Sequence, residues 1–287
     1  MKFGIIPPYA TAPADDPDFV RAFARLAERR GLESIWVVEH VVMPTEYRSR
    51  YPYDPSGRSP LHARVGLPDP LVWLAYAAAA TKRIRLATGV LNLPQRNPVL
   101  LAKELATLDR LSQGRLEIGV GIGWLREEAQ ALGVSFEDRA ARAEDYLKAM
   151  RALWSEPVAS YEGPFVRFRD VVCEPRPLGG SVRIVIGGHT PAAARRAARF
   201  GDGFFPLGPG SRIAELRAML EQEARRMGRD PKAIELTLVG SPDQAGAERC
   251  ARLGASRMVF ASPTGDLEKL DRILAEFQGG VAKRFAD

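Results

Sequence analysis

Cysteine, histidine and long apolar runs are all scarce in this chain of 287 residues. Cys173 and Cys250 lie far apart and outside any recognised motif. Together with the absence of a secretory segment at the amino terminus, they predict a reducing, cytoplasmic location. No apolar run is long enough to span a bilayer, since residues 71–80 predict only a helix, so we expect no membrane association. Histidines and carboxylates show no zinc-ligand spacing, so we expect no metal site.

The charge balance is only mildly basic. Lysine and arginine number 41 against 35 acidic residues, a net charge of +6. The basic residues are spread along predicted helices, as at 195–196 and 225–226, where solvent-exposed helix faces explain most of them. No aromatic and basic residues alternate as nucleic-acid readers require, so we expect no nucleic-acid partner. A hydrophobic fraction of 46% and a charged fraction of 26% indicate a globular protein with a sizeable core.

Short apolar strands alternate with amphipathic helices along the whole chain. The expected strands are 2–7, 34–40, 83–90, 115–120, 183–186, 202–207, 234–239 and 257–261. This alternation predicts an α/β fold, a (β/α)8 TIM barrel forming one domain over residues 1–287, with an irregular insertion after the second strand. A doubly wound open sheet is the alternative. It would more often carry a dinucleotide motif after its first strand, where this chain has Pro7-Pro8-Tyr9.

Several helix starts carry a capping residue followed by proline, as at Asp69-Pro70, Asn97-Pro98 and Thr190-Pro191. Ser135 and Asp138 predict a capping box for the helix that runs to Trp154. We expect residues 155–180 to form an irregular connection and the basic tail after residue 280 to be loose.

Residues 41–67 form a long segment without periodicity that leaves directly from His40. It is rich in proline, tyrosine, arginine, glycine and serine. Such a segment inside a compact domain is typical of a lid or a binding loop, although a solvated surface insertion is the plain alternative. We interpret it as a lid over the site, with its arginines and tyrosines available to an anionic ligand.

Glu39 and His40 stand where the apolar run 35–38 ends. A buried strand that delivers two titratable groups at its carboxyl end is how α/β folds place their chemistry, so both are candidate catalytic residues. The alternative is that they only begin a polar loop. A neutral histidine near its reference pKa of about 6.5 can act as a general acid or base. Glu39 could orient His40, stabilise its charge, or bind the cofactor.

Glycines follow three further strands. Gly89 permits close backbone approach at the end of the third strand. The run 119–124 places its third glycine too early for a dinucleotide fingerprint, and it suits equally a tight turn or close passage beside a ring or phosphate. Gly187-Gly188-His189-Thr190 leads into a new helix, whose free amides and dipole predict an anion site, with an ordinary tight turn as the alternative. In a barrel all these strand ends share one mouth.

These same segments resemble one family. The matching pieces are Trp36-Val37-Val38-Glu39-His40, residues 87–98, residues 114–124, and residues 186–188 through 201–203. The chain resembles the luciferase-like monooxygenase superfamily and is most similar to its branch of oxidoreductases that depend on the deazaflavin coenzyme F420. The resemblance covers residues 1 to about 207.

The resemblance implies a flavin or deazaflavin at the carboxyl mouth of the barrel, with His40 near the redox ring and Glu39 beside the cofactor. It implies that Gly89 and Val90 pack against the ring face, at a bulge with a cis peptide. The other implied cofactor-binding residues are Ile122, Gly123, Trp124, Gly187, Gly188, His189 and Thr190. Trp124 would form a flat apolar wall. His62 and His189 we interpret as loop-stabilising rather than catalytic.

Two departures limit the substrate. Sugar-phosphate dehydrogenases of this family have a glutamate where this chain has Trp124, which argues against that substrate. The segment 240–244 is short where light-emitting relatives carry an insertion, which argues against bioluminescence. We expect hydride transfer between F420 and a small organic substrate.

Three alternatives remain at this point. They are an FMN-dependent monooxygenase using oxygen, a non-catalytic flavin-binding barrel and, more distantly, a metal-dependent hydrolase. The resemblance also suggests that the apolar helices 71–80 and 99–111 bury a homodimer face, with the outer packing layer of the barrel as the alternative.

Overall fold

The computed structural model describes residues 1–61 and 63–285. Eight parallel strands close on themselves, because each pairs with its neighbour and the last pairs with the first. The barrel strands are β1 (Lys2–Ile6), β2 (Ser34–Val37), β3 (Arg85–Thr88), β5 (Leu116–Gly121), β8 (Arg183–Gly187), β9 (Gly203–Phe205), β10 (Glu235–Val239) and β11 (Arg257–Ala261). The predicted (β/α)8 barrel is confirmed, with most strands shorter than expected.

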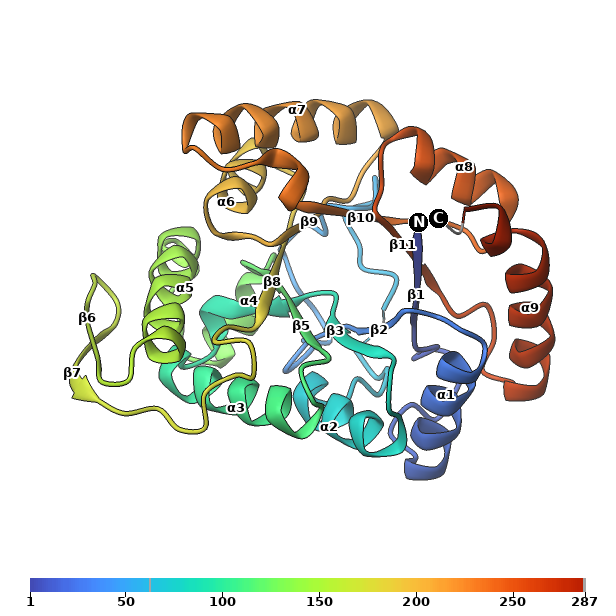
Figure 1. The fold of residues 1–287 in the computed structure, drawn as a ribbon, viewed down its shortest axis with the longest axis horizontal. Helices are drawn as coiled ribbons and strands as arrows, with labels where there is room; N and C mark the ends of the chain where they lie inside the picture. The colour runs from blue at the N-terminus through green and yellow to red at the C-terminus, as the bar shows by residue number, and fades with distance from the viewer. Residues whose placement is uncertain (62, 286–287) are drawn as a thin grey trace.

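A ring of helices surrounds the strands (Figure 1). Its members are α1 (Pro17–Arg29), α2 (Pro70–Ala80), α3 (Pro98–Leu111), α5 (Arg139–Ser155), α6 (Pro191–Phe200), α7 (Gly210–Arg226), α8 (Gln244–Arg252) and α9 (Leu267–Gly280). The predicted caps are present. Asp69, Asn97 and Thr190 each accept a hydrogen bond from an amide of the first turn, and proline follows each of them. These local signals therefore set where the helices begin.

Three local predictions are wrong. The capping box is absent, because Asp138 caps α5 without its side chain and Ser135 contacts Glu137 instead. Residues 155–180 are not merely irregular, since β6 (Ala159–Glu162) and β7 (Arg167–Val171) form an antiparallel hairpin beside α5. The tail continues as a 3-10 turn, η3 (Ala282–Phe285).

Buried residues occupy two zones. The larger zone lies between the strands and the helices, and the smaller lies inside the barrel around Trp36, Val185, Phe205 and Val259. Because a barrel strand is buried on both faces, it reads as a continuous apolar run. Below this inner zone, the buried pair Arg257 and Glu117 joins at 2.7 Å.

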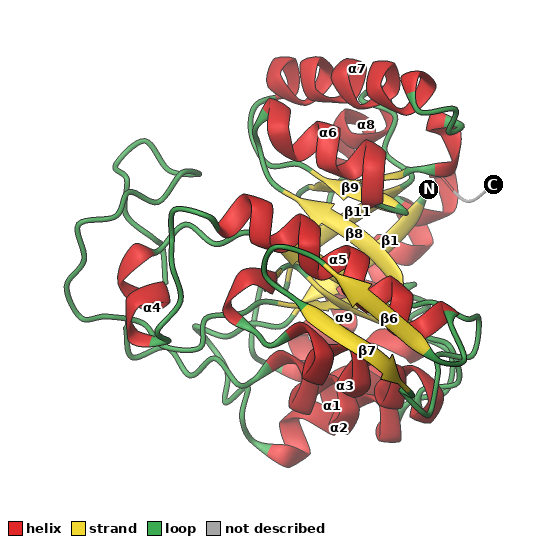
Figure 2. Ribbon diagram, turned by 90° about the vertical axis from the view of Figure 1, so that its left-hand side faces the viewer, coloured by secondary structure: helices red, strands yellow, loops and turns green. Residues whose placement is uncertain are grey.

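The additional elements lie mainly at the carboxyl ends of the strands. They are β4 (Leu91–Asn92), η1 (Leu93–Gln95) and α4 (Arg126–Ala131), together with η2 (Pro231–Ala233). Between β2 and α2 the described residues form neither helix nor strand. Figure 2 shows α4 projecting with long loops from one side of the barrel. Among the described residues, no helix combines the length and apolarity needed to cross a membrane.

Candidate active site

A cavity of about 520 Å³ opens at the carboxyl ends of the strands. Every residue that the sequence nominated for catalysis or cofactor binding lines it. These are Glu39, His40, Gly89, Val90, Ile122, Gly123, Trp124, Gly187, Gly188, His189 and Thr190. The segments after β2, β3, β5 and β8 therefore meet around one space despite their separation along the chain. The roles assigned to these residues stay predictions.

Val90 forms one wall of the cavity, and two glycines make room for it. The Gly89–Val90 peptide is cis, as the family resemblance implied. A Cβ atom built on Gly121 or on Gly187 would lie 2.7 Å from a methyl carbon of Val90. Any side chain at either glycine would therefore displace Val90. This packing explains why glycine ends β5 and β8.

Glu39 is buried and does not orient His40, which corrects one of the sequence interpretations. Its carboxylate accepts a hydrogen bond from the Asn92 amide at 2.5 Å and pairs with the Arg96 guanidinium, whose Nε lies at 2.9 Å. Burial raises the pKa of Glu39, while Arg96 and the Asn92 amide oppose this rise. Glu39 thus ties the segment after β2 to the segment after β3.

His40 instead pairs with Glu128, a residue that the sequence analysis did not identify. The Nδ1 atom of His40 lies 3.0 Å from Glu128 Oε2. The His40 ring also meets Trp124 edge to face, with ring centroids 5.9 Å apart. Glu128 belongs to the short helix α4, which the sequence analysis had not predicted. The one available signal was a pair of acidic residues shortly after a glycine-rich strand end.

The insertion loop packs against the site through its aromatic residues. Tyr47 and Tyr51 contact Trp124 edge to face, with centroids 5.5 and 5.2 Å apart, and Tyr53 contacts His189 at 4.9 Å. Tyr51 and Tyr53 line the cavity. Burial raises the pKa of Tyr53 to about 12, so its hydroxyl stays protonated. His62, which the sequence analysis also considered, lies outside the described residues.

Glu127 of α4 attaches the same loop at a second point. It accepts hydrogen bonds from the Arg48 amide at 2.7 Å and from the Ser49 hydroxyl at 2.7 Å. Desolvation opposes ionisation, but these hydrogen bonds outweigh it and lower the pKa of Glu127 to about 2. The carboxylate is therefore ionised at neutral pH and holds the loop against α4.

Two arginines make one part of the cavity lining cationic. Arg139 and Arg196 both line it, near Thr190 at the first turn of α6. Arg196 is only 5% exposed, so its interpretation as part of a solvated helix face is wrong. Its Nε forms an ion pair with Glu144 Oε1 at 3.3 Å, whereas the buried Nε of Arg139 makes no hydrogen bond. Burial lowers the pKa of both side chains.

The arginines of the insertion loop, which we expected to meet an anionic ligand, make different contacts. Arg50 lines the cavity. Arg58 lies over the Tyr47 ring at 5.0 Å, and Arg126, which lies outside the loop at the start of α4, pairs with Glu137. Sequence alone could not separate these cases, because all of them occupy polar, aperiodic segments.

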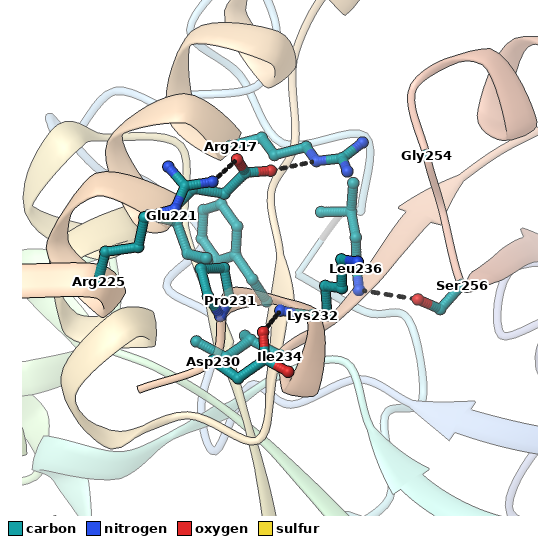
Figure 3. Close-up of a pocket in the computed structure, with 12 residues that line it drawn as sticks. Arg217, Glu221, Arg225, Asp230, Pro231, Lys232, Ile234, Leu236, Gly254 and Ser256 are labelled. Atoms are coloured by element: carbon teal, nitrogen blue, oxygen red, sulfur yellow. Dashed lines mark hydrogen bonds and ion pairs between the residues drawn. The ribbon is translucent and has the colours of Figure 1, made fainter. Parts of the chain in front are cut away.

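A second cavity, of about 540 Å³, lies between α7, the turn after it and the loop before β11 (Figure 3). Its principal charged groups neutralise one another, since Glu221 accepts hydrogen bonds from both Arg217 and Arg225 at 3.0 Å. None of the residues nominated from the sequence lines it. Within residues 1–61 and 63–285, no three histidine, cysteine or carboxylate side chains gather as a metal site would require.

Known proteins similar to this chain use two kinds of cofactor. An uncharacterised protein of Mycobacterium tuberculosis is 35% identical over 245 residues, 84% of this chain and 86% of that protein. The F420-dependent glucose-6-phosphate dehydrogenase of Kineococcus radiotolerans is 32% identical over 257 residues, covering 86% of this chain and 71% of the enzyme. The FMNH2-dependent dimethylsulfone monooxygenase of Pseudomonas fluorescens is 31% identical over 194 residues, covering 67% of this chain and 48% of the enzyme.

Solved structures of similar proteins share the fold of this chain. The monooxygenase RslO1 of Streptomyces bottropensis superposes with a TM-score of 0.80 at 26% identity, over 100% of both chains. An F420-dependent secondary alcohol dehydrogenase, solved with an F420–acetone adduct, gives 0.78 at 19% identity over 100% of this chain and 99% of its own, a likeness that shows the fold alone. Residues 1–280 match the sequence model of the luciferase-like monooxygenases. The chain therefore belongs to the luciferase-like monooxygenase family of oxidoreductases.

Proposed function

We propose that this protein transfers a hydride between coenzyme F420 and a small organic substrate at the mouth of the barrel. The observation that carries the proposal is one cavity that combines a histidine, a flat apolar wall and a cationic lining. The relative named as F420-dependent aligns with 86% of this chain, whereas the one named as FMNH2-dependent aligns with 67%. The family resemblance at Trp124 argues against glucose 6-phosphate as the substrate, and we propose small alcohols and ketones as the first substrates to test.

The residues present fit such a cofactor. Val90 and Trp124 offer apolar surfaces to a flat ring, and their neighbours Gly123 and Gly187 carry no side chain there. The Nε of Arg139 is a buried donor without a hydrogen bond, which a phosphate oxygen could accept, and Arg196 would add its positive charge although its Nε also faces Glu144 at 3.3 Å. The amides at the first turn of α6 add to this cationic region. When bound, F420 supplies the hydride acceptor or donor.

The chain itself would move the proton. His40 Nδ1 faces Glu128, so Nε2 is the ring nitrogen left for the substrate. During alcohol oxidation Nε2 would accept the hydroxyl proton while the hydride leaves carbon, and during ketone reduction it would return that proton. The aromatic residues of the loop would exclude water from this step. No residue of the chain is oxidised or reduced.

Cofactor titration tests the proposal directly. Purified protein is titrated with F420 and with FMN side by side, and binding is followed by fluorescence. We expect F420 to bind at least about 10-fold more tightly, a difference of about 1.4 kcal/mol. A panel of small alcohols and ketones is then assayed through the absorbance of F420. Tighter binding of FMN, with oxygen consumed when FMNH2 is supplied, would instead establish the alternative function, an FMN-dependent monooxygenase.

Arg196→Gln should weaken F420 binding by about 10- to 100-fold, because a hydrogen bond to a charged group contributes about 1.5–3 kcal/mol. Arg139→Gln should act in the same direction. The matched control is Arg195→Gln, because Arg195 neighbours Arg196 on α6 but is exposed. Isothermal titration of the three variants checks the expectation, with thermal unfolding to verify folding. Equal affinity of Arg195→Gln and Arg196→Gln would exclude the buried arginine from the cofactor site.

We also propose that the protein forms a homodimer through the α2–α3 face, defined as Val72, Tyr76, Val99 and Leu100. These side chains are 70%, 39%, 40% and 59% exposed. The sequence of α2 contains no charged residue. Exposed apolar side chains on two helices that pack together are typical of an interface.

Val72→Glu should therefore convert the dimer to a monomer, since the interface would bury an unpaired charge. Met227→Glu, at the end of α7 and 46% exposed, is the control and should stay dimeric. Sedimentation velocity distinguishes the species. A monomeric parent protein, or an unchanged Val72→Glu dimer, would refute this interface.

A further inference from the structure

Glu128 lies behind the cavity wall, and its carboxylate has several hydrogen-bond partners. It is 0% exposed. Its Oε1 accepts hydrogen bonds from the amides of Val41 at 2.7 Å and Val42 at 3.4 Å. Its Oε2 lies 3.0 Å from His40 Nδ1 and 3.3 Å from Gln95 Nε2. One side chain therefore gathers the segment after β2, the turn η1 after β3, and the helix α4 after β5.

This arrangement determines which nitrogen of His40 carries hydrogen. The two amides and the Gln95 side chain all donate to Glu128, so the carboxylate acts as a hydrogen-bond acceptor in this structure. If Nδ1 had no hydrogen, its lone pair would face a carboxylate oxygen at 3.0 Å. With Glu128 as the acceptor, the contact is favourable when Nδ1–H donates. In the neutral ring, Nε2 then keeps a free lone pair.

We propose that Glu128 is a positioning residue that holds His40 as the Nδ1–H tautomer, with Nε2 available to the cavity as the proton acceptor. Glu128 does not itself line the cavity, whereas His40 does. The pairing is thus that of a base oriented by a third group behind it. The catalytic use of Nε2 rests on the proposed function, but the tautomer does not.

The surroundings of His40 leave Glu128 as its charged partner. Glu39, next in the chain, is turned toward Arg96. Gln95, from η1, is uncharged and binds Glu128. Trp124 packs against the imidazole, and Tyr47 and Tyr51 contact Trp124 from the loop. In this set, Glu128 is the titratable group that the structure places within hydrogen-bond distance of the ring.

Glu127 provides a matched control. It lies beside Glu128 on α4 and also binds the backbone of the insertion loop, but through Arg48 and Ser49. Loss of either carboxylate would loosen the loop. Loss of Glu128 alone should change the state of the imidazole, so a comparison of Glu127→Gln with Glu128→Gln separates orientation of His40 from general support of the loop.

The first experiment is nitrogen-15 NMR of the histidine side chains in mildly alkaline buffer, where imidazoles are neutral. The full chain contains only three histidines, so single substitutions assign the signals. We expect His40 to show a protonated Nδ1 and an unprotonated Nε2 in the parent protein and in Glu127→Gln. In Glu128→Gln we expect a mixture of tautomers. A parent protein with hydrogen on Nε2, or no change in Glu128→Gln, would overturn the proposal.

The second experiment needs no substrate. Diethyl pyrocarbonate acylates unprotonated imidazole nitrogen, and peptide mass spectrometry follows its reaction with His40 over a range of pH. In Glu128→Gln the pH midpoint should move to lower pH, because the imidazolium loses its carboxylate partner. Glu128→Asp should restore part of the parent profile, and Glu127→Gln should match it. Identical profiles for all four proteins would also overturn the proposal.

These outcomes are independent of turnover. If no cofactor or substrate supports activity while the NMR result holds, the proposed function fails and the positioning of His40 by Glu128 stands.

Discussion

Replacing His40 with asparagine should lower the turnover number with F420 by about 100-fold or more, because loss of a positioned acid–base group typically costs that much. An asparagine amide can still donate to Glu128, which accepts from Nδ1 in the parent protein. The substitution therefore removes Nε2 while preserving the contact behind it. The measurement is steady-state turnover of F420 with the best substrate of the alcohol and ketone panel.

Cofactor affinity is the internal control for this variant. We expect the dissociation constant for F420 to stay within about 2-fold of the value for the parent protein. This is well below the roughly 10-fold change that a loss of about 1.4 kcal/mol of binding free energy would produce. Unchanged turnover in His40→Asn would exclude His40 as the acid–base residue, whereas absence of turnover in the parent protein with its cofactor bound would favour a non-catalytic flavin-binding barrel. Loss of binding and turnover together would show that His40 acts on the cofactor site as a whole.

Replacing Arg257 with methionine should destabilise the protein by up to about 3–5 kcal/mol, the cost of breaking a buried pair, because it removes the nearest partner of Glu117. Glu117 keeps the more distant Arg183 at 3.4 Å and Arg85 at 3.6 Å. Arg257 is 1% exposed and donates to Glu117 at 2.7 Å and to Glu33 at 2.8 and 2.9 Å. Glu117 is also 1% exposed. Methionine retains apolar contact with Trp36, whose ring lies 5.3 Å from the guanidinium carbon. For a chain of this size we expect a fall in Tm of about 6–20 °C.

Chemical denaturation measures this effect, and Arg252→Gln is its control. Arg252 pairs with Glu248 at 3.8 Å on the surface of α8, and the two side chains are 70% and 44% exposed. An exposed pair contributes less than about 1 kcal/mol. Equal stability of Arg257→Met and the parent protein would mean that the charges inside the barrel are solvated. The double variant Arg257→Met, Glu117→Leu should recover part of the loss, since no buried charge would be stranded.

The same network predicts sensitivity to acid. Burial by itself would raise the pKa of Glu33, but hydrogen bonding to Arg257 and its charge outweigh this and hold that pKa below its ordinary value of 4.5. The stabilisation from the Glu33–Arg257 interaction is therefore fully present at pH values above 4.5. It is lost as the pH falls through the lowered pKa of Glu33 in the folded protein. We therefore expect the free energy of unfolding to fall between neutral pH and a pH below 4.5. This fall should be larger in the parent protein than in Arg257→Met.

Local sequence signals predicted most of the scaffold. Proline after a capping residue placed the starts of α2, α3 and α6, because a cap and a fixed φ angle act within one turn. The failures were equally local. The hairpin of β6 and β7 is largely exposed and lacks an apolar run, and α4 has only six residues, too few to show a period.

The sequence by itself determined that Glu39, His40 and the glycines lie at the carboxyl ends of strands, because apolar runs and turn residues are readable one segment at a time. Only the tertiary structure decided the partners. His40 meets Glu128 across 88 residues, and Glu39 meets Arg96 across 57. Arg196 changed from an expected surface residue to a buried cavity residue. Such contacts depend on closure of the barrel, which brings distant strand ends to one mouth, and no local pattern encodes which side chains then face each other.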